Sequence, residues 1–95
     1  MYQIQRTTTF KRCIKKLQKK KVCFDPLAEA LRYLQNSDVV PLPARLNFHA
    51  LSGNLAGRLE IHIGGRNSNW VLVYEIDGNI LRLIFTGTHD DMKKL

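Results

Sequence analysis

Three strand-like stretches in the second half of the chain constrain its fold more than any other feature. Residues 58–63 alternate strictly between polar and apolar side chains, which is typical of a strand with one buried face. Residues 70–76 are apolar at almost every position, as expected for a central strand buried on both faces. Residues 80–85 are predicted to form the last strand, after residues 77–79, Asp-Gly-Asn, which are typical of a hairpin turn. Together they predict an antiparallel meander.

The first part of the chain predicts two helices. Apolar side chains recur at helical spacing in two stripes: Phe10, Cys13, Ile14 and Leu17, then Leu27, Ala30, Leu31 and Leu34. Threonines before the first stripe and Asp25-Pro26 before the second are typical helix starts. We therefore expect two antiparallel helices over residues 8–37, after a short strand at residues 2–6. Two prolines in residues 38–56 exclude a regular helix and predict an ordered connector.

The predicted order is strand, helix, helix and three strands. It indicates an α+β fold with two N-terminal antiparallel helices packed on a mostly antiparallel four-stranded sheet. Leu81, Leu83 and Phe85 share one side of the last strand, so we expect them to face the core together. A length of 95 residues suits one core, so we expect a single domain over residues 1–95.

Positive charge is concentrated at the start of the chain. The formal net charge is +7, and eight of the fifteen basic residues lie within residues 1–24, which contain no acidic residue. This asymmetry indicates either a polyanionic partner or a solvated helix face. No apolar segment approaches the roughly 20 residues that cross a bilayer, so we expect a cytoplasmic protein without membrane contact.

All three histidines lie at the ends of predicted elements. His49 is in the connector, His62 ends the first strand of the meander, and His89 follows the last strand. The first and third strands of a meander run in the same direction, so His62 and His89 can meet at one edge of the sheet. A single histidine is more often structural, but a group can supply a general acid and a general base near neutral pH.

Other candidate residues allow two readings each. Three arginines lie on or beside the polar side of the meander, where they can bind phosphate or pair with Glu60 or Glu75: Arg58, Arg66 and Arg82. Trp70 is either a core residue or a surface on which a base stacks. The histidines and cysteines lack the local spacing of metal ligands, so we expect neither a metal site nor a cofactor.

Several motifs, in order and at compatible spacing, are similar to those of a known family. Residues 49–53 read His-Ala-Leu-Ser-Gly, residues 60–63 Glu-Ile-His-Ile, residues 69–74 Asn-Trp-Val-Leu-Val-Tyr, residues 81–83 Leu-Arg-Leu and residues 86–89 Thr-Gly-Thr-His. Together they resemble the bacterial type II toxins of the RelE/ParE superfamily, in the YafQ-like branch.

The resemblance implies a RelE-like fold and the toxin of a toxin–antitoxin pair. It implies an endoribonuclease (mRNA interferase) that cleaves mRNA in the ribosomal A site without a metal and so inhibits translation. The implied partners are a cognate antitoxin, the 70S ribosome and mRNA. In this reaction the ribose 2′-hydroxyl attacks the adjacent phosphorus, which requires a base, an acid and charge stabilisation.

The resemblance also implies residue roles. We expect His49 and His89 to share the proton transfer, His62 to orient the phosphate and Arg82 to offset the developing charge. The expected substrate-binding residues are Asn69, Trp70, Arg58, Arg66, Lys15, Lys16, Lys19 and Lys20. The basic helix would neutralise ribosomal RNA phosphates or be covered by an acidic antitoxin segment.

The chain departs from the family pattern in three places. Asn69 stands where the family usually has an aspartate, so a proton-accepting carboxylate is missing there. Residues 64–68 look like a short loop insertion, and Met92, Lys93 and Leu95 occupy a stretch that often carries an aromatic residue. Two alternatives stay open. One is a non-catalytic RNA-binding or ribosome-binding protein, and the other is a ParE-like inhibitor of DNA gyrase, a branch that generally lacks the histidine set.

Overall fold

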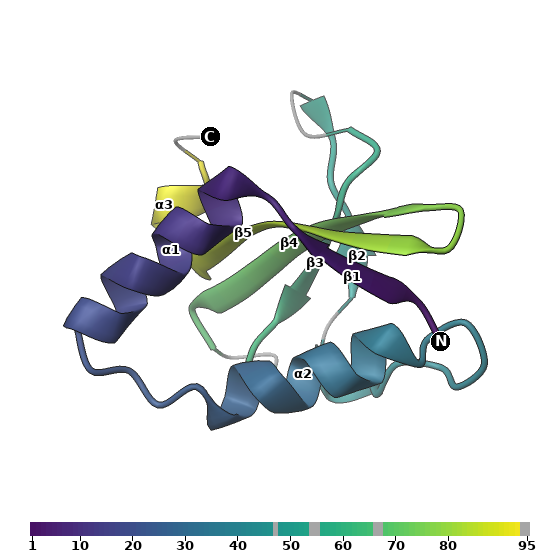
Figure 1. Ribbon diagram of the computed structural model, residues 1–95, viewed down its shortest axis with the longest axis horizontal. Coiled ribbons are helices and arrows are strands. Elements are labelled where there is room, and N and C mark those ends of the chain that lie inside the picture. Colours follow the sequence, from purple (N-terminus) through teal and green to yellow (C-terminus); the bar gives the residue numbers. More distant parts are fainter. Residues whose placement is uncertain (47, 54–55, 66–67, 94–95) are drawn as a thin grey trace.

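A computed structural model confirms the predicted α+β architecture and describes residues 1–46, 48–53, 56–65 and 68–93. The elements are β1 (Gln3–Arg6), α1 (Thr8–Lys19), α2 (Asp25–Gln35), a 3₁₀ helix η1 (Ala44–Leu46), β2 (His49–Ala50), β3 (Leu59–His62), β4 (Trp70–Asp77), β5 (Ile80–Thr88) and α3 (His89–Met92). Figure 1 shows α1 and α3 at one end of the sheet and α2 lying across it. Within the described residues, no helix is both long and apolar enough to cross a bilayer.

The sheet has five strands in the order β1-β5-β4-β3-β2. β1 pairs with β5 in parallel, and the other neighbours are antiparallel. The strand that the sequence does not predict is β2, in which His49 pairs with Glu60 and Ala50 pairs with Leu59. A two-residue strand is too short to show a detectable alternation, so sequence periodicity predicts only four strands.

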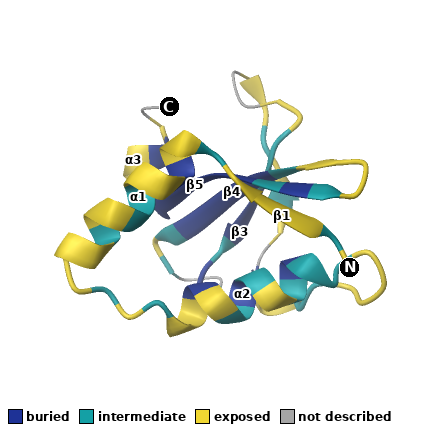
Figure 2. Cartoon of the chain, in the orientation of Figure 1, coloured by how far each residue is buried: buried dark blue, intermediate teal, exposed yellow. Residues whose placement is uncertain are grey.

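Both helices contribute to one hydrophobic cluster against the sheet. Its fully or almost fully buried members are Phe10 of α1, Leu27, Ala30 and Leu34 of α2, Leu46 of η1, and the strand residues Ile61, Ile63, Leu72, Tyr74, Leu81 and Leu83. Thr7 caps α1, since its hydroxyl accepts a hydrogen bond from the Phe10 N–H and donates one to the Leu83 carbonyl at 2.8 Å. The helix is thereby fixed to β5. Figure 2 shows the buried residues concentrated in β4 and β5 and on the inner side of α2.

A β-bulge in β5 changes which residues face this cluster. Leu83 pairs with Tyr74 but Phe85 pairs with Val73, so Ile84 is the extra residue. Phe85 therefore points to the opposite side of the sheet, into a second cluster made of Val71, Val73, Ile84, Phe85 and Met92. The expectation that Phe85 faces the same side as Leu81 and Leu83 is wrong, because the bulge reverses the alternation halfway along the strand.

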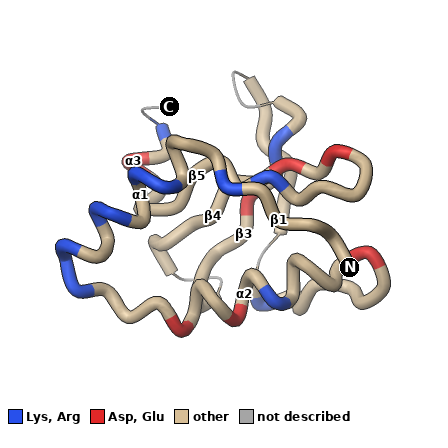
Figure 3. The backbone as a smooth tube through the Cα atoms, viewed as in Figure 1, with Lys and Arg blue, Asp and Glu red and all other residues tan. Residues whose placement is uncertain are grey.

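Basic residues follow α1 and the turn after it, as Figure 3 shows. The apolar face of α1 packs inward through Phe10 and Ile14, so its lysines stay exposed. The positive charge of the N-terminal segment therefore lies on one end of the molecule.

Candidate functional site

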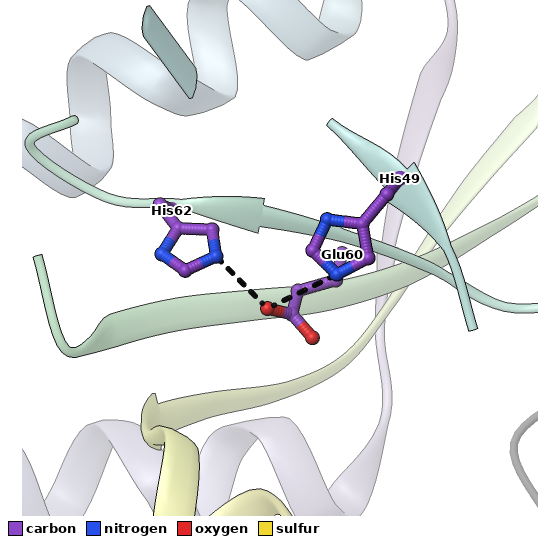
Figure 4. A group of neighbouring side chains, drawn as sticks. All are labelled: His49, Glu60 and His62. Carbon is purple, nitrogen blue, oxygen red and sulfur yellow. Dashed lines mark ion pairs between the residues drawn. The ribbon is translucent and has the colours of Figure 1, made fainter. Parts of the chain in front are cut away.

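A buried carboxylate lies among the three histidines. The Glu60 side chain is 0% exposed, and its Oε1 lies 3.2 Å from His62 Nε2, 3.4 Å from His89 Nε2 and 3.6 Å from His49 Nε2. The ring centroid of His62 lies 5.9 Å from the ring centroid of His49 and 5.9 Å from that of His89. Figure 4 shows the His49 and His62 imidazoles directed at the Glu60 carboxylate. We call these four residues the histidine cluster.

Three elements, β2, β3 and α3, bring these residues together. Glu60 and His62 are two apart in β3 and so share one face of the sheet. The pairing of β2 with β3 places His49 directly opposite Glu60. His89 begins α3 at the end of β5, where its N–H donates to the Asn69 backbone carbonyl at 3.1 Å. The predicted meeting of His62 and His89 is found, and His49 joins them through a strand that the sequence does not predict.

The carboxylate needs positive charge beside it. Within the described part of the chain, neither side-chain oxygen of Glu60 has a hydrogen-bond partner, and a buried carboxylate is costly unless it is paired. His62 Nδ1 lies 3.0 Å from the Ser68 carbonyl oxygen, so both nitrogens of this ring face oxygen acceptors. A proton on His62 Nε2, or a metal ion between that nitrogen and Oε1, therefore satisfies the contact.

The three imidazoles differ in exposure. The side chains of His49 and His89 are 43% and 42% exposed, whereas that of His62 is 12% exposed. The two outer rings can contact a bound molecule, and the inner ring is held between Glu60 and the Ser68 carbonyl.

Glu60 is the candidate site residue that the sequence does not reveal. The sequence suggests it only as a partner for arginine, but the structure pairs it with imidazoles. The alternation of residues 58–63 already places Glu60 on the same side as His62, so the signal was present. Its burial was not detectable, because that depends on the strands on both sides of β3.

The structure does not bring Arg82 into the histidine cluster. Its guanidinium donates to Glu75 at 2.7 Å and to Gln5 at 2.8 Å, and lies 3.6 Å from Asp77. These carboxylates raise the pKa of Arg82, the hydrogen bond to Glu75 most of all. The ion-pairing alternative therefore holds for Arg82, with Glu75 as the partner, and its expected role in offsetting charge on the phosphate stays a prediction.

The other two arginines differ from Arg82. Arg58 directly precedes β3, two residues before Glu60, and no ion pair holds it within the described residues. Arg66 lies outside the described residues.

Asn69 directly precedes β4 and Trp70 begins it, and the two side chains have different contacts. The His89 backbone N–H donates to the Asn69 side-chain oxygen at 3.4 Å, so Asn69 helps to place His89. Trp70 is half-buried against the first hydrophobic cluster, and its indole N–H donates to the Thr86 hydroxyl at 2.8 Å. Its main role is therefore structural, although it also lines a surface groove. Met92 in the late stretch is a buried core residue.

The four lysines predicted to bind RNA are all exposed but do not lie together. Lys16 and Lys20 line a groove between α1 and β5, whereas Lys15 and Lys19 do not.

Comparison with solved structures shows which class of proteins has this fold. It matches the crystal structure of YafQ from Escherichia coli strain BL21(DE3) with a TM-score of 0.84 and 26% identity, over 97% of this chain and 98% of that one. It matches the E. coli DinJ–YafQ complex with a TM-score of 0.82 and 27% identity over 97% and 98%. A metal-bound toxin from Helicobacter pylori matches with a TM-score of 0.82 and 26% identity over 97% and 99%. The fold is that of small bacterial toxins.

Sequence comparison identifies the family within this class. The family described as "Bacterial toxin of type II toxin-antitoxin system, YafQ" matches residues 2–94. The mRNA interferase toxin YafQ from E. coli strain K12 is 34% identical over 62 residues, which are 62% of this chain and 64% of that protein. The matched segment thus spans less than two thirds of this relative. The chain belongs to the YafQ family of bacterial toxins, which confirms the resemblance seen in its sequence.

Proposed function

We propose that this protein is a ribosome-dependent endoribonuclease that cleaves mRNA in the A site and is neutralised by a cognate antitoxin. The convergence of three imidazoles on one buried carboxylate supports the nuclease chemistry. An E. coli relative is named an mRNA interferase, and YafQ of E. coli has been solved in complex with DinJ. The antitoxin, the ribosome and mRNA are therefore the proposed partners. The cluster favours this reading over a gyrase inhibitor or a non-catalytic binder, neither of which requires it.

The imidazoles take part in the proposed reaction by transferring protons. One outer imidazole removes the proton of the ribose 2′-hydroxyl, whose oxygen attacks the adjacent phosphorus. The bond from phosphorus to the 5′-oxygen breaks, and the other outer imidazole protonates that leaving oxygen. The products are a 2′,3′-cyclic phosphate and a 5′-hydroxyl end. Exposure supports His49 and His89 for these two roles, and His62, held by Glu60 and Ser68, for orienting the phosphate.

A cation is still required to offset the charge that develops on the phosphate. We assign this role to Arg58 in place of Arg82, because Arg58 directly precedes β3, two residues before Glu60. Arg82 is already bound by two carboxylates.

Separate His49→Ala and His89→Ala variants test the proposal. Each should lower cleavage by about 10²–10⁴-fold, the usual contribution of one acid or base group. Primer extension on an mRNA translated with the purified protein, with and without ribosomes, measures this loss. Arg32→Ser on the exposed surface of α2 is the matched control and should keep full activity. Full activity in both histidine variants would reject the assignment, and equal cleavage without ribosomes would reject ribosome dependence.

We propose as a second function that the histidine cluster binds a divalent transition-metal ion. Ligand atoms of His49, Glu60 and His62 all lie within 4.8 Å of one another. Two metal bonds of about 2.0–2.1 Å at a tetrahedral angle would put ligand atoms about 3.3 Å apart. The observed distances of 3.2 and 3.6 Å from the His62 and His49 nitrogens to Glu60 Oε1 are close to this value. Imidazole ligands favour Zn²⁺ or Cu²⁺, and the H. pylori relative was solved with a metal.

A bound metal would oppose RNA cleavage, because it would occupy the imidazole lone pairs that accept protons. Calorimetric titration with Zn²⁺ should show one site in the wild-type protein. Glu60→Gln should weaken that site by about 10–100-fold, whereas Glu75→Gln, which alters a carboxylate paired with Arg82, should not. Cleavage should persist with a chelator that removes Zn²⁺ but leaves the Mg²⁺ that ribosomes need, and it should stop on addition of Zn²⁺. Equal Zn²⁺ binding by both variants would contradict this second function, and loss of cleavage with the Zn²⁺ chelator would contradict the inhibitory effect of the metal.

A further inference from the structure

We propose that a groove between α1 and the end of β5 binds single-stranded RNA next to the cleaved bond. This proposal rests on the proposed function, because the RNA in question is the strand whose phosphate lies at the histidine cluster. The groove encloses about 380 Å³, within the range of pockets that hold small ligands. We call it the α1–β5 groove.

One wall of the α1–β5 groove is basic. Arg12, Lys16 and Lys20 line it at intervals of four residues, which puts their side chains along one side of α1. Among the residues described along the groove, Asp91 is the only acidic one. Three positive charges against one negative charge favour a polyanionic occupant.

The floor of the groove is apolar. Trp70, Phe85 and Gly87 contribute to it. A Cβ atom on Gly87 would lie 2.9 Å from Cζ of the Phe85 ring, so glycine is what allows this ring to cover the strand. An apolar surface beside a row of cations suits single-stranded nucleic acid, since bases or riboses contact the floor while phosphates face the basic wall.

The groove lies next to the histidine cluster along the sheet. His62 pairs with Val71, and Val71 pairs with Gly87, so one residue of the cluster and one residue of the groove floor lie on the same line across the sheet. Thr88 lines the groove and His89 follows it directly. An RNA strand with its phosphate at the imidazoles would therefore have a neighbouring nucleotide within reach of the groove. This proximity favours RNA over an acidic protein segment as the occupant.

The lysines of α1 provide a matched test. The purified full-length chain is titrated against a fluorescent 2′-O-methyl RNA strand, which cannot be cleaved because its 2′-oxygen is blocked. Binding is measured by anisotropy at several salt concentrations. The groove variant Arg12→Ser/Lys16→Ser/Lys20→Ser and the control variant Lys11→Ser/Lys15→Ser/Lys19→Ser each remove three positive charges from α1.

The groove variant should bind at least about tenfold more weakly, and its salt slope should fall by about 2, since each phosphate contact to a single strand contributes about 0.7. The control variant should lose clearly less affinity for the RNA, and its salt slope should fall clearly less. Equal losses in the two variants, or no loss in either, would overturn the proposal. Polyglutamate should displace the RNA far less effectively than polyuridine does. Equally effective displacement would also overturn the proposal, because any polyanion would then suffice.

Two further measurements keep the result unambiguous. Crosslinking of 4-thiouridine RNA to the wild-type protein should label Trp70 or Phe85, and labelling only outside the groove would contradict the proposal even if a variant failed to fold. Ribosome-dependent cleavage is measured in parallel on the wild-type protein. Cleavage without preferential binding in the groove would reject this inference alone. Binding in the groove without cleavage would reject only the proposed nuclease.

Discussion

Glu60 combines an energetic cost with a chemical use. Burying an unpaired carboxylate costs several kcal/mol, and this one is fully buried with three imidazole nitrogens as its neighbours. Its charge can hold three rings from three elements in one place. A residue that serves the site in this way adds little to the stability of the fold.

Replacement of Glu60 by Gln tests this trade-off. Cleavage should fall by about 10–100-fold, the size usual when a partner that orients a histidine is lost. The thermal midpoint should stay the same or rise, because a buried charge is removed. Primer extension and thermal unfolding followed by circular dichroism measure the two effects. A lower midpoint with full activity would show that Glu60 is structural instead.

At the level of elements, β5 connects the core to the site. Leu81 and Leu83 pack with the helices, the bulge at Ile84 reverses the alternation of side chains, and Phe85 therefore faces the second hydrophobic cluster. Gly87 is required by this arrangement, since the Phe85 ring occupies the space of its missing side chain. Within residues 86–89, Thr-Gly-Thr-His, packing against Phe85 accounts for the glycine. The contact with Glu60 accounts for the histidine.

Gly87→Ala should destabilise the protein by about 1–3 kcal/mol, the usual cost of overpacking. Phe85→Leu removes the ring atom that the new methyl group would meet. The double variant should therefore lose clearly less than the sum of the two single losses. Urea unfolding of the four proteins measures the coupling. Strictly additive losses would mean that the contact between Gly87 and Phe85 does not limit this position.

For the molecule as a whole, the core contains one titratable phenol. Tyr74 lies in the centre of β4 and is 1% exposed. Burial raises its pKa well above the ordinary value. The folded protein therefore keeps this proton over a pH range in which the unfolded chain loses it.

The sign of the pH dependence follows from this shift. The contribution of Tyr74 to stability is complete below about pH 10, the ordinary pKa of tyrosine, and is lost as the pH rises toward the higher pKa of the folded state. Tyr74→Phe should therefore unfold at higher pH than the wild-type protein in an alkaline titration. Tyr33→Phe, a half-buried position on α2, is the control and should follow the wild-type curve. Identical curves for all three proteins would contradict this origin of alkaline unfolding.

The sequence by itself determined the helices, the meander, the concentration of positive charge and the three histidines, because each is visible in local periodicity or residue type. The tertiary structure decided the rest. The β2 strand, the bulge, the burial of Glu60 and the pairing of Arg82 with Glu75 all depend on which residues pair across strands. The spacing of residues along the chain does not show that ligand atoms of His49, Glu60 and His62, from β2 and β3, lie within 4.8 Å of one another. Such contacts join residues far apart in the chain, and no local pattern records them.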